Sequence, residues 1–180
     1  MSLFRNCCVI AAAGTIACIS VRPAAAAPGP VIPGVGGPSA ITAGIYLPND
    51  SNTKDGGGST QFSGEFRYTL PVPNPLDVPA RTVASLGVEF GTSSGKHSTI
   101  VPLTVGEVIS SKGSPVGAGN FFYGAGLGAY FLNRSGFSTA TRFGGYGELG
   151  YNFTSALFLD AKYQIVQHAD GLNLNVGLRF

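Results

Sequence analysis

The chain has 180 residues, of which 44% are hydrophobic and only 11% are charged, and it contains 27 glycines. Charged residues make up about 25% of an average soluble domain, so this composition argues against an ordinary soluble domain. The glycine content argues against a helical protein, because each glycine in a helix interior costs about 1 kcal/mol. The length indicates a single domain.

The first 26 residues have the layout of a secretory signal peptide. Arg5 precedes an uncharged apolar run at 7–21, and the small residues of RPAAAAPGP follow. This is the order of basic start, apolar middle and A-x-A cleavage site, and we predict cleavage after Ala26. One alternative is a transmembrane anchor, although the run is shorter than the ~20 residues that span a bilayer. The other is a lipoprotein signal with Cys18 as the lipidated residue.

Removal of the signal peptide changes the chemistry that is available to the mature chain. Cys7, Cys8 and Cys18 all lie within the signal, so no disulfide or thiol chemistry is expected after cleavage. Loss of Arg5 and Arg22 leaves nine basic residues against nine acidic residues. A balanced charge gives no support for a nucleic acid partner.

The rest of the chain divides into a leader and a β-domain. Residues 27–38 are rich in proline and glycine and have no pattern, which is typical of an extended leader. From 39 to 180 apolar and polar residues alternate with period two between turn residues, and no run has a helical period. Most segments reach the ~9–11 residues that a tilted strand needs to cross a membrane. The eight predicted strands are 40–48, 59–71, 81–92, 97–110, 119–132, 138–153, 156–167 and 171–180.

The polar face of these strands carries charges of both signs in mid-strand. A soluble barrel would turn this face outward, but it has too few charges and too many Gly and Ser residues to cover a surface. In a membrane barrel the charges point inward and pair with each other, and eight strands leave an interior that side chains just fill. We therefore predict an all-β protein, an eight-stranded antiparallel up-and-down transmembrane β-barrel. Its predicted lumen charge network comprises Glu65, Arg67, Glu89, Arg142, Glu148, Asp160, Lys162 and Arg179.

Glycines in YGAGLGAY fall on the same inner face. We interpret Gly124, Gly126 and Gly128 as small residues that make room for long neighbours such as Arg142 and Tyr146. The alternative is a phosphate-binding glycine loop, which needs a strand-to-helix junction, and no helix is predicted to follow.

The segment HSTIVPLTVGEV breaks the pattern. Glu107 falls on the apolar face with Leu103 and Val105, and Pro102 removes a donor from the ladder of hydrogen bonds. Two interpretations are open. Either a bulge near Pro102 or Gly106 rotates Glu107 inward, or Glu107 lies at the membrane edge, where a charge costs little.

The signal peptide, the eight alternating segments and the terminal LNLNVGLRF resemble a known group. This group is the OmpA, OmpX and OmpW-like superfamily of small outer-membrane β-barrels of Gram-negative bacteria, and the resemblance covers residues 39–180. It implies an outer-membrane location with both ends of the barrel domain in the periplasm. It also implies that the barrel-assembly machinery recognises the last strand through Leu172, Leu174, Val176, Leu178 and Phe180.

The same resemblance implies four outward loops, near 49–58, 92–97, 133–138 and 167–171, of which only the first is long. Short loops argue against an adhesin. His97, His168 and Asp170 fall in or near these loops, and we interpret them as solvated residues because no further ligands stand at metal spacing.

We predict a mainly structural envelope protein, a monomer in outer-membrane lipid with a lumen filled by side chains. No residue is marked as a nucleophile, so we expect no enzyme activity, cofactor or metal. One alternative is a porin-like narrow channel or a passage for small molecules, including apolar ones. The other is a secreted, soluble, lipocalin-like ligand-binding barrel.

The mature protein is expected to begin at Ala27, because cleavage follows the small residues Ala24 and Ala26. Mass spectrometry of the protein isolated from membranes measures this directly. An intact Met1, or a lipid on Cys18, would contradict the prediction.

Overall fold

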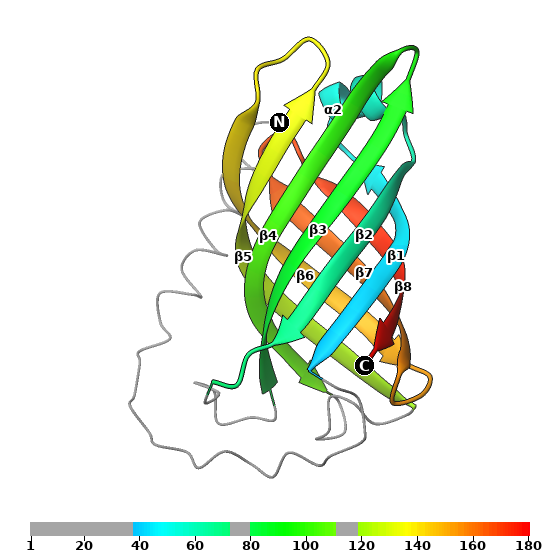
Figure 1. Ribbon diagram of the computed structural model, residues 1–180, viewed down its shortest axis with the longest axis vertical. Helices are drawn as coiled ribbons and strands as arrows, with labels where there is room; N and C mark the ends of the chain where they lie inside the picture. Colours follow the sequence, from blue (N-terminus) through cyan, green and yellow to red (C-terminus); the bar gives the residue numbers. More distant parts are fainter. Residues whose placement is uncertain (1–37, 73–79, 111–118) are drawn as a thin grey trace, which may run out of the picture.

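The computed structural model describes residues 38–72, 80–110 and 119–180, which form one closed antiparallel β-barrel of eight strands (Figure 1). The predicted signal peptide at 1–26 and all but the last residue of the predicted leader lie outside the described residues, as do most of the turn residues between the second and third and the fourth and fifth strands. The elements are β1 (Ser39–Pro48), α2 (Ser51–Gly57), β2 (Gln61–Thr69), β3 (Ala80–Ser93), β4 (Lys96–Ser110), β5 (Asn120–Arg134), β6 (Ala140–Asn152), β7 (Leu157–Val166) and β8 (Gly171–Arg179).

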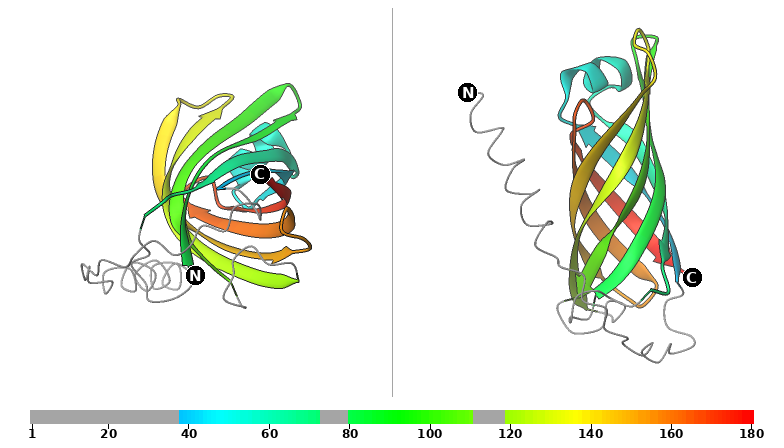
Figure 2. Two further views of the ribbon diagram at one scale, coloured as in Figure 1. Left: turned by 60° about the horizontal axis from the view of Figure 1, so that its bottom comes forward. Right: turned by 90° about the vertical axis from the view of Figure 1, so that its left-hand side faces the viewer.

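Each strand pairs with the next one along the chain, and β8 pairs with β1 to close the barrel. The predicted eight-stranded up-and-down barrel is confirmed, with strand boundaries that differ by a few residues. β1 begins and β8 ends at one end of the barrel, and α2 lies at the opposite end (Figures 1 and 2). We call these the terminal end and the helix end. Closure leaves no strand edge unpaired.

Side chains alternate between the two faces of the barrel wall. In β8, Leu174 is 40% exposed and its neighbour Asn175 is 4% exposed. The strands turn their apolar side chains outward and their polar side chains inward, which is the reverse of a soluble barrel. All eight strands contribute to this outer apolar surface, for example through Ile45, Phe66, Leu86, Leu103, Leu127, Leu149, Leu159 and Val176.

The inner wall of β4 and β5 has glycines where Tyr146 of β6 crosses the lumen. A Cβ on Gly126 would lie 2.6 Å from a ring carbon of Tyr146, and a Cβ on Gly106 would lie 2.5 Å from its hydroxyl. A Cβ on Gly124 would lie 2.8 Å from the carboxylate of Glu148. Gly126 therefore makes room for Tyr146, as the sequence predicts, and Gly124 makes room for Glu148. Gly128 instead lies against Leu103 and Thr104, and not against Arg142.

The irregular segment around Pro102 contains no bulge. The pairs Leu86–Leu103 and Glu89–Ile100 keep one register on either side of the proline. A Cβ on Gly87 would lie only 3.0 Å from the Pro102 ring, so a glycine stands where the ring needs room. The interpretation in which a bulge rotates a side chain inward is wrong.

Glu107 instead stays on the outer face, near the terminal end of β4. Thr82, its partner on β3, donates a hydrogen bond of 2.5 Å from its hydroxyl to Glu107 Oε1. This position fits the alternative in which the carboxylate lies at the edge of an apolar belt.

The short helix α2 lies in the segment 49–58, which the sequence predicts as an outward loop. Asp50 caps the helix by accepting a hydrogen bond of 3.1 Å from the backbone of Thr53. Gly58 ends it with a φ of 86° and donates to the Lys54 carbonyl, a conformation that favours glycine. Seven residues are too few to display a helical period. Among the residues that the structure describes, no helix is long and apolar enough to span a bilayer.

The two faces of β8 are expected to respond oppositely to substitution. Leu174→Arg places a charge on the outer apolar surface and should destabilise the barrel in phospholipid vesicles by about 2–4 kcal/mol. Asn175→Ser, on the inner face one residue later, should cost less than about 1 kcal/mol. Urea unfolding in vesicles measures both free energies, and a larger effect at Asn175 would show that the outer surface is not the lipid surface.

Candidate functional site

The centre of the lumen is occupied by Arg67 of β2, which contacts three carboxylates. Its guanidinium lies 2.8 Å from Glu65 on the same strand and 2.9 Å from Glu148 of β6, and it also pairs with Asp160 of β7. All four side chains are buried. Arg67 therefore connects β2 with β6 and β7, which lie far from it along the chain.

Lys162 of β7 extends this cluster to a second base. Its ammonium lies 2.6 Å from Glu65 and 3.4 Å from the hydroxyl of Thr104, and it stands 4.1 Å from the ring centroid of Tyr146. An ammonium over an aromatic ring is attracted by the ring's negative face. Glu65, Arg67, Glu148, Asp160 and Lys162 form one connected set, which we call the central network.

Glu89 of β3 is buried without an ion pair among the described residues. Its two carboxylate oxygens instead accept hydrogen bonds of 2.8 Å from the side-chain amides of Gln164 and Asn173. Two neutral donors satisfy the oxygens without adding charge, so this carboxylate lies beside the central network and is not part of it.

The two remaining residues of the predicted charge network lie apart from it, at opposite ends of the lumen. Arg142 of β6 lies near the helix end, next to its register partner Tyr130 on β5. Its Nε has no hydrogen-bond partner among the described residues. Arg179 stands at the terminal end, 4.1 Å from the ring centroid of Phe158. The structure therefore brings together five of the eight predicted residues.

Several inner residues that shape the lumen were not among the predicted site residues. Arg81 and Arg134 share the inner phase of their strands, and extending the period-two count to the strand ends would have found them. The amides of Gln164 and Asn173 share that phase too, but a search for charged residues passes over them.

At the helix end, α2 covers the mouth of the barrel. Thr53 is fully buried, and its hydroxyl donates to the His168 carbonyl at 2.9 Å while its own carbonyl accepts from the Gln61 amide at 3.1 Å. A Cβ on Gly91 would lie 2.2 Å from the Gly57 carbonyl, so helix and wall fit closely. Arg134 adds an ion pair of 3.5 Å to Asp50.

The two histidines lie at the helix end, His97 in β4 and His168 between β7 and β8. His168 Nδ1 is 3.6 Å from the Asp50 carboxylate, and His97 Nδ1 is 2.8 Å from the Ser135 hydroxyl. Asp170 accepts a hydrogen bond from the backbone of Val166. Within 38–72, 80–110 and 119–180, no group of three or more residues with ligating side chains stands at a spacing that would hold a metal ion.

Comparison with known proteins identifies the fold. No family model and no curated protein sequence matches the chain. The chain is similar to the crystal structure of Neisserial surface protein A, with a TM-score of 0.52 and 13% identity over 79% of this chain and 96% of that one. It is also similar to the Yersinia pestis outer membrane protein Ail in a phospholipid bilayer nanodisc, with a TM-score of 0.50 and 16% identity over 80% and 99% of the two chains.

A third similar structure is the N-terminal β-barrel domain of Pseudomonas aeruginosa OprF. Its TM-score is 0.50, with 16% identity over 81% of this chain and 99% of that domain. The chain therefore has the fold of small eight-stranded outer-membrane barrels, and the identities show the fold alone.

Arg67 is expected to be the side chain on which lumen stability depends most. Arg67→Met leaves Glu148 and Asp160 buried without an ion pair among the described residues, while Glu65 keeps Lys162, and removal of one partner from a buried ion cluster costs roughly 3–5 kcal/mol. Arg142→Met removes an inner arginine that has no ion pair in the described part of the chain, and should cost clearly less. Denaturant unfolding of the refolded proteins measures both, and equal losses would contradict a central role for Arg67.

Proposed function

We propose that this chain is an outer-membrane β-barrel protein of a Gram-negative envelope, with a mainly structural role and a lumen closed by side chains. The observation that carries the proposal is the combination of an apolar outer surface with a charged, ion-paired interior. A barrel with this sidedness is stable only where hydrocarbon surrounds it.

The outer surface supports the membrane location. Large side chains such as Phe66, Leu86 and Val176 are each about half exposed, and exposure of so much apolar surface to water would lead to association. Aromatic rings gather near the terminal end, where Tyr151 packs 4.9 Å from Phe121 and 5.1 Å from Phe153. Aromatic girdles mark the interfaces of membrane barrels. Ail, which shares the fold, is an outer membrane protein whose structure is that in a phospholipid bilayer nanodisc.

The interior supports a closed lumen. The central network crosses the barrel through Arg67, and α2 covers one mouth with buried hydrogen bonds from Thr53. A solute would have to separate buried ion pairs in order to pass, and an unpaired buried charge costs several kcal/mol. These two barriers stand in series along the barrel axis.

Location and assembly follow from the same proposal. The signal peptide at 1–26 directs export, and the barrel-assembly machinery recognises β8 through its outward apolar positions. The protein acts as a monomer in outer-membrane lipid, without enzyme activity and without a nucleic acid partner.

Two other functions remain as alternatives. A narrow channel or small-molecule passage draws support from the polar lining of the lumen, and would require the central network to rearrange. A soluble lipocalin-like barrel is opposed by the outer apolar surface and would be extracted without detergent.

Ion conductance in a planar bilayer tests the closed lumen. The wild-type barrel should give no stable unitary steps, because the central network blocks the path. A variant in which a short Gly/Ser loop replaces 51–57 should also show no conductance, since it loses α2 but keeps the central network. Unitary conductance of the wild type would favour the channel function. Conductance of the loop variant alone would show that α2, and not the central network, closes the lumen.

A further inference from the structure

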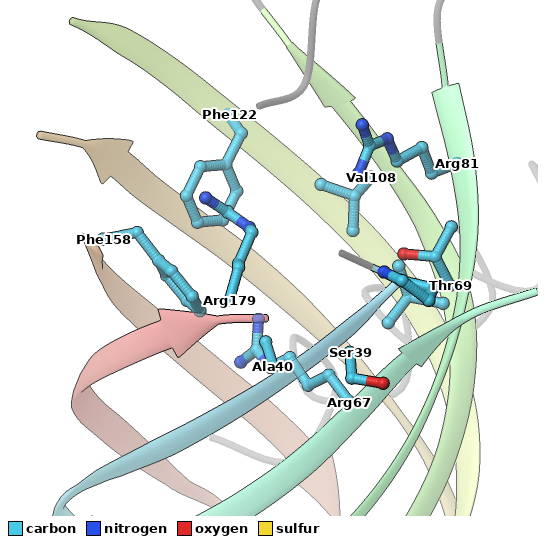
Figure 3. A pocket seen from close by; sticks show the side chains of 11 residues that line it. Ser39, Ala40, Arg67, Thr69, Arg81, Val108, Phe122, Phe158 and Arg179 are labelled. Atoms are coloured by element: carbon cyan, nitrogen blue, oxygen red, sulfur yellow. The ribbon is translucent and has the colours of Figure 1, made fainter. Parts of the chain in front are cut away.

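A pocket opens inside the barrel at the terminal end, opposite α2 (Figure 3). It lies where β1 begins and where β2 and β8 end, so Ser39, Thr69 and Arg179 form part of its wall. Its volume is about 50 Å³. One water molecule needs roughly 10–15 Å³ of such a cavity. The pocket therefore has room for a few waters or for one small polyatomic group.

Among the described residues, every charged side chain that lines the pocket is an arginine. Arg67, Arg81 and Arg179 come from three different strands and reach the pocket from different sides (Figure 3). None of the inner carboxylates is part of the lining. Arg67 is paired with carboxylates of the central network, so Arg81 and Arg179 are the cations of the lining that have no ion pair among the described residues.

Arg179 has no anionic partner in the described part of the chain. Its guanidinium lies 4.1 Å from the ring centroid of Phe158 and 5.7 Å from that of Phe122, and its buried Nη1 has no hydrogen-bond partner. The rings shield the charge from water on these sides. A buried polar group without a partner is costly, and its unused N–H groups mark a place for an acceptor.

Arg81 is a second cation without an ion pair among the described residues. It is half-buried at the start of β3. The carboxylates of Glu65, Glu148 and Asp160 are already paired with Arg67 or Lys162, and Glu89 is held by two amides. Two like charges therefore share a confined space, and an external anion would relieve their repulsion.

We propose that this pocket, the arginine pocket, binds one phosphate group between Arg81 and Arg179. Guanidinium groups match phosphate oxygens through paired N–H donors, and the hydroxyl of Thr69 in the wall adds a neutral donor (Figure 3). The phosphate comes either from a small soluble phosphate or from the headgroup of a membrane phospholipid at the barrel rim. Binding of the soluble form does not depend on the proposed function.

The test uses the refolded barrel in a non-ionic detergent and phosphate-free buffer. Inorganic phosphate should bind saturably in calorimetry and should raise the thermal unfolding temperature, because it binds only the folded state. Arg81→Gln and Arg179→Gln should each weaken binding by at least about tenfold, since a hydrogen bond to a charged group is lost.

Arg142→Gln is the matched control, because it removes an inner arginine at the other end of the barrel that has no ion pair in the part of the chain that the structure describes. It should keep wild-type affinity. General stabilisation by phosphate through exclusion from the protein surface acts on all variants alike, so only a difference between the variants reports the pocket. If Arg179→Gln does not refold, Arg81→Gln and the control decide the question.

A second arm identifies the source of the phosphate. The same variants are unfolded in micelles that contain phosphatidylglycerol and in micelles that contain uncharged diacylglycerol. A response to inorganic phosphate assigns the soluble form, and a response to phosphatidylglycerol alone assigns the headgroup, provided that each requires Arg81 and Arg179. The proposal is overturned if the wild type binds neither probe, or if Arg142→Gln loses binding as much as Arg81→Gln does.

Discussion

The pairing of Arg67 with carboxylates from three strands is the interaction on which the interior depends. A barrel of eight strands has a lumen too narrow for bulk water, so inner side chains must fill it and satisfy one another. Glycines in β4 and β5 leave the space that Tyr146 uses, and Tyr146 in turn stands against the Lys162 ammonium. Packing and charge pairing inside the barrel are therefore one arrangement, in which a change to either disturbs the other.

The strands and their two faces could be predicted because period-two alternation is a local property of the sequence. Leu174 and Asn175 are assigned to opposite faces by counting alone, and the structure places them so. The helix α2 was missed because seven residues show no period, although Asp50 and Gly58 carry the chemistry of its caps. The outcome at Glu107 depended on whether β3 and β4 keep their register past Pro102, and a single strand does not contain that information.

The partners of the inner charges could not be read from the sequence for a related reason. Alternation says that Arg67, Arg142 and Arg179 point inward, but their height in the lumen follows from the stagger between strands around the whole barrel. That stagger places Arg67 beside three carboxylates and leaves Arg142 and Arg179 at opposite ends of the lumen. Equal numbers of inner acids and bases therefore do not mean an even distribution of charge. In the described part of this lumen, the ion pairs of the central network lie at the centre, and arginines without an ion pair lie at the terminal end.

The long-range character of the central network also bears on how the barrel forms. Arg67 and Glu148 are 81 residues apart, Arg67 and Asp160 are 93 apart, and Glu65 and Lys162 are 97 apart. No single hairpin contains these pairs, so hairpins that entered hydrocarbon one at a time would carry unmatched charges. Contacts between distant segments also form slowly, because the chain must close large loops first. The inner charges thus favour a concerted closure, in which the walls meet and the charges are neutralised in the same step.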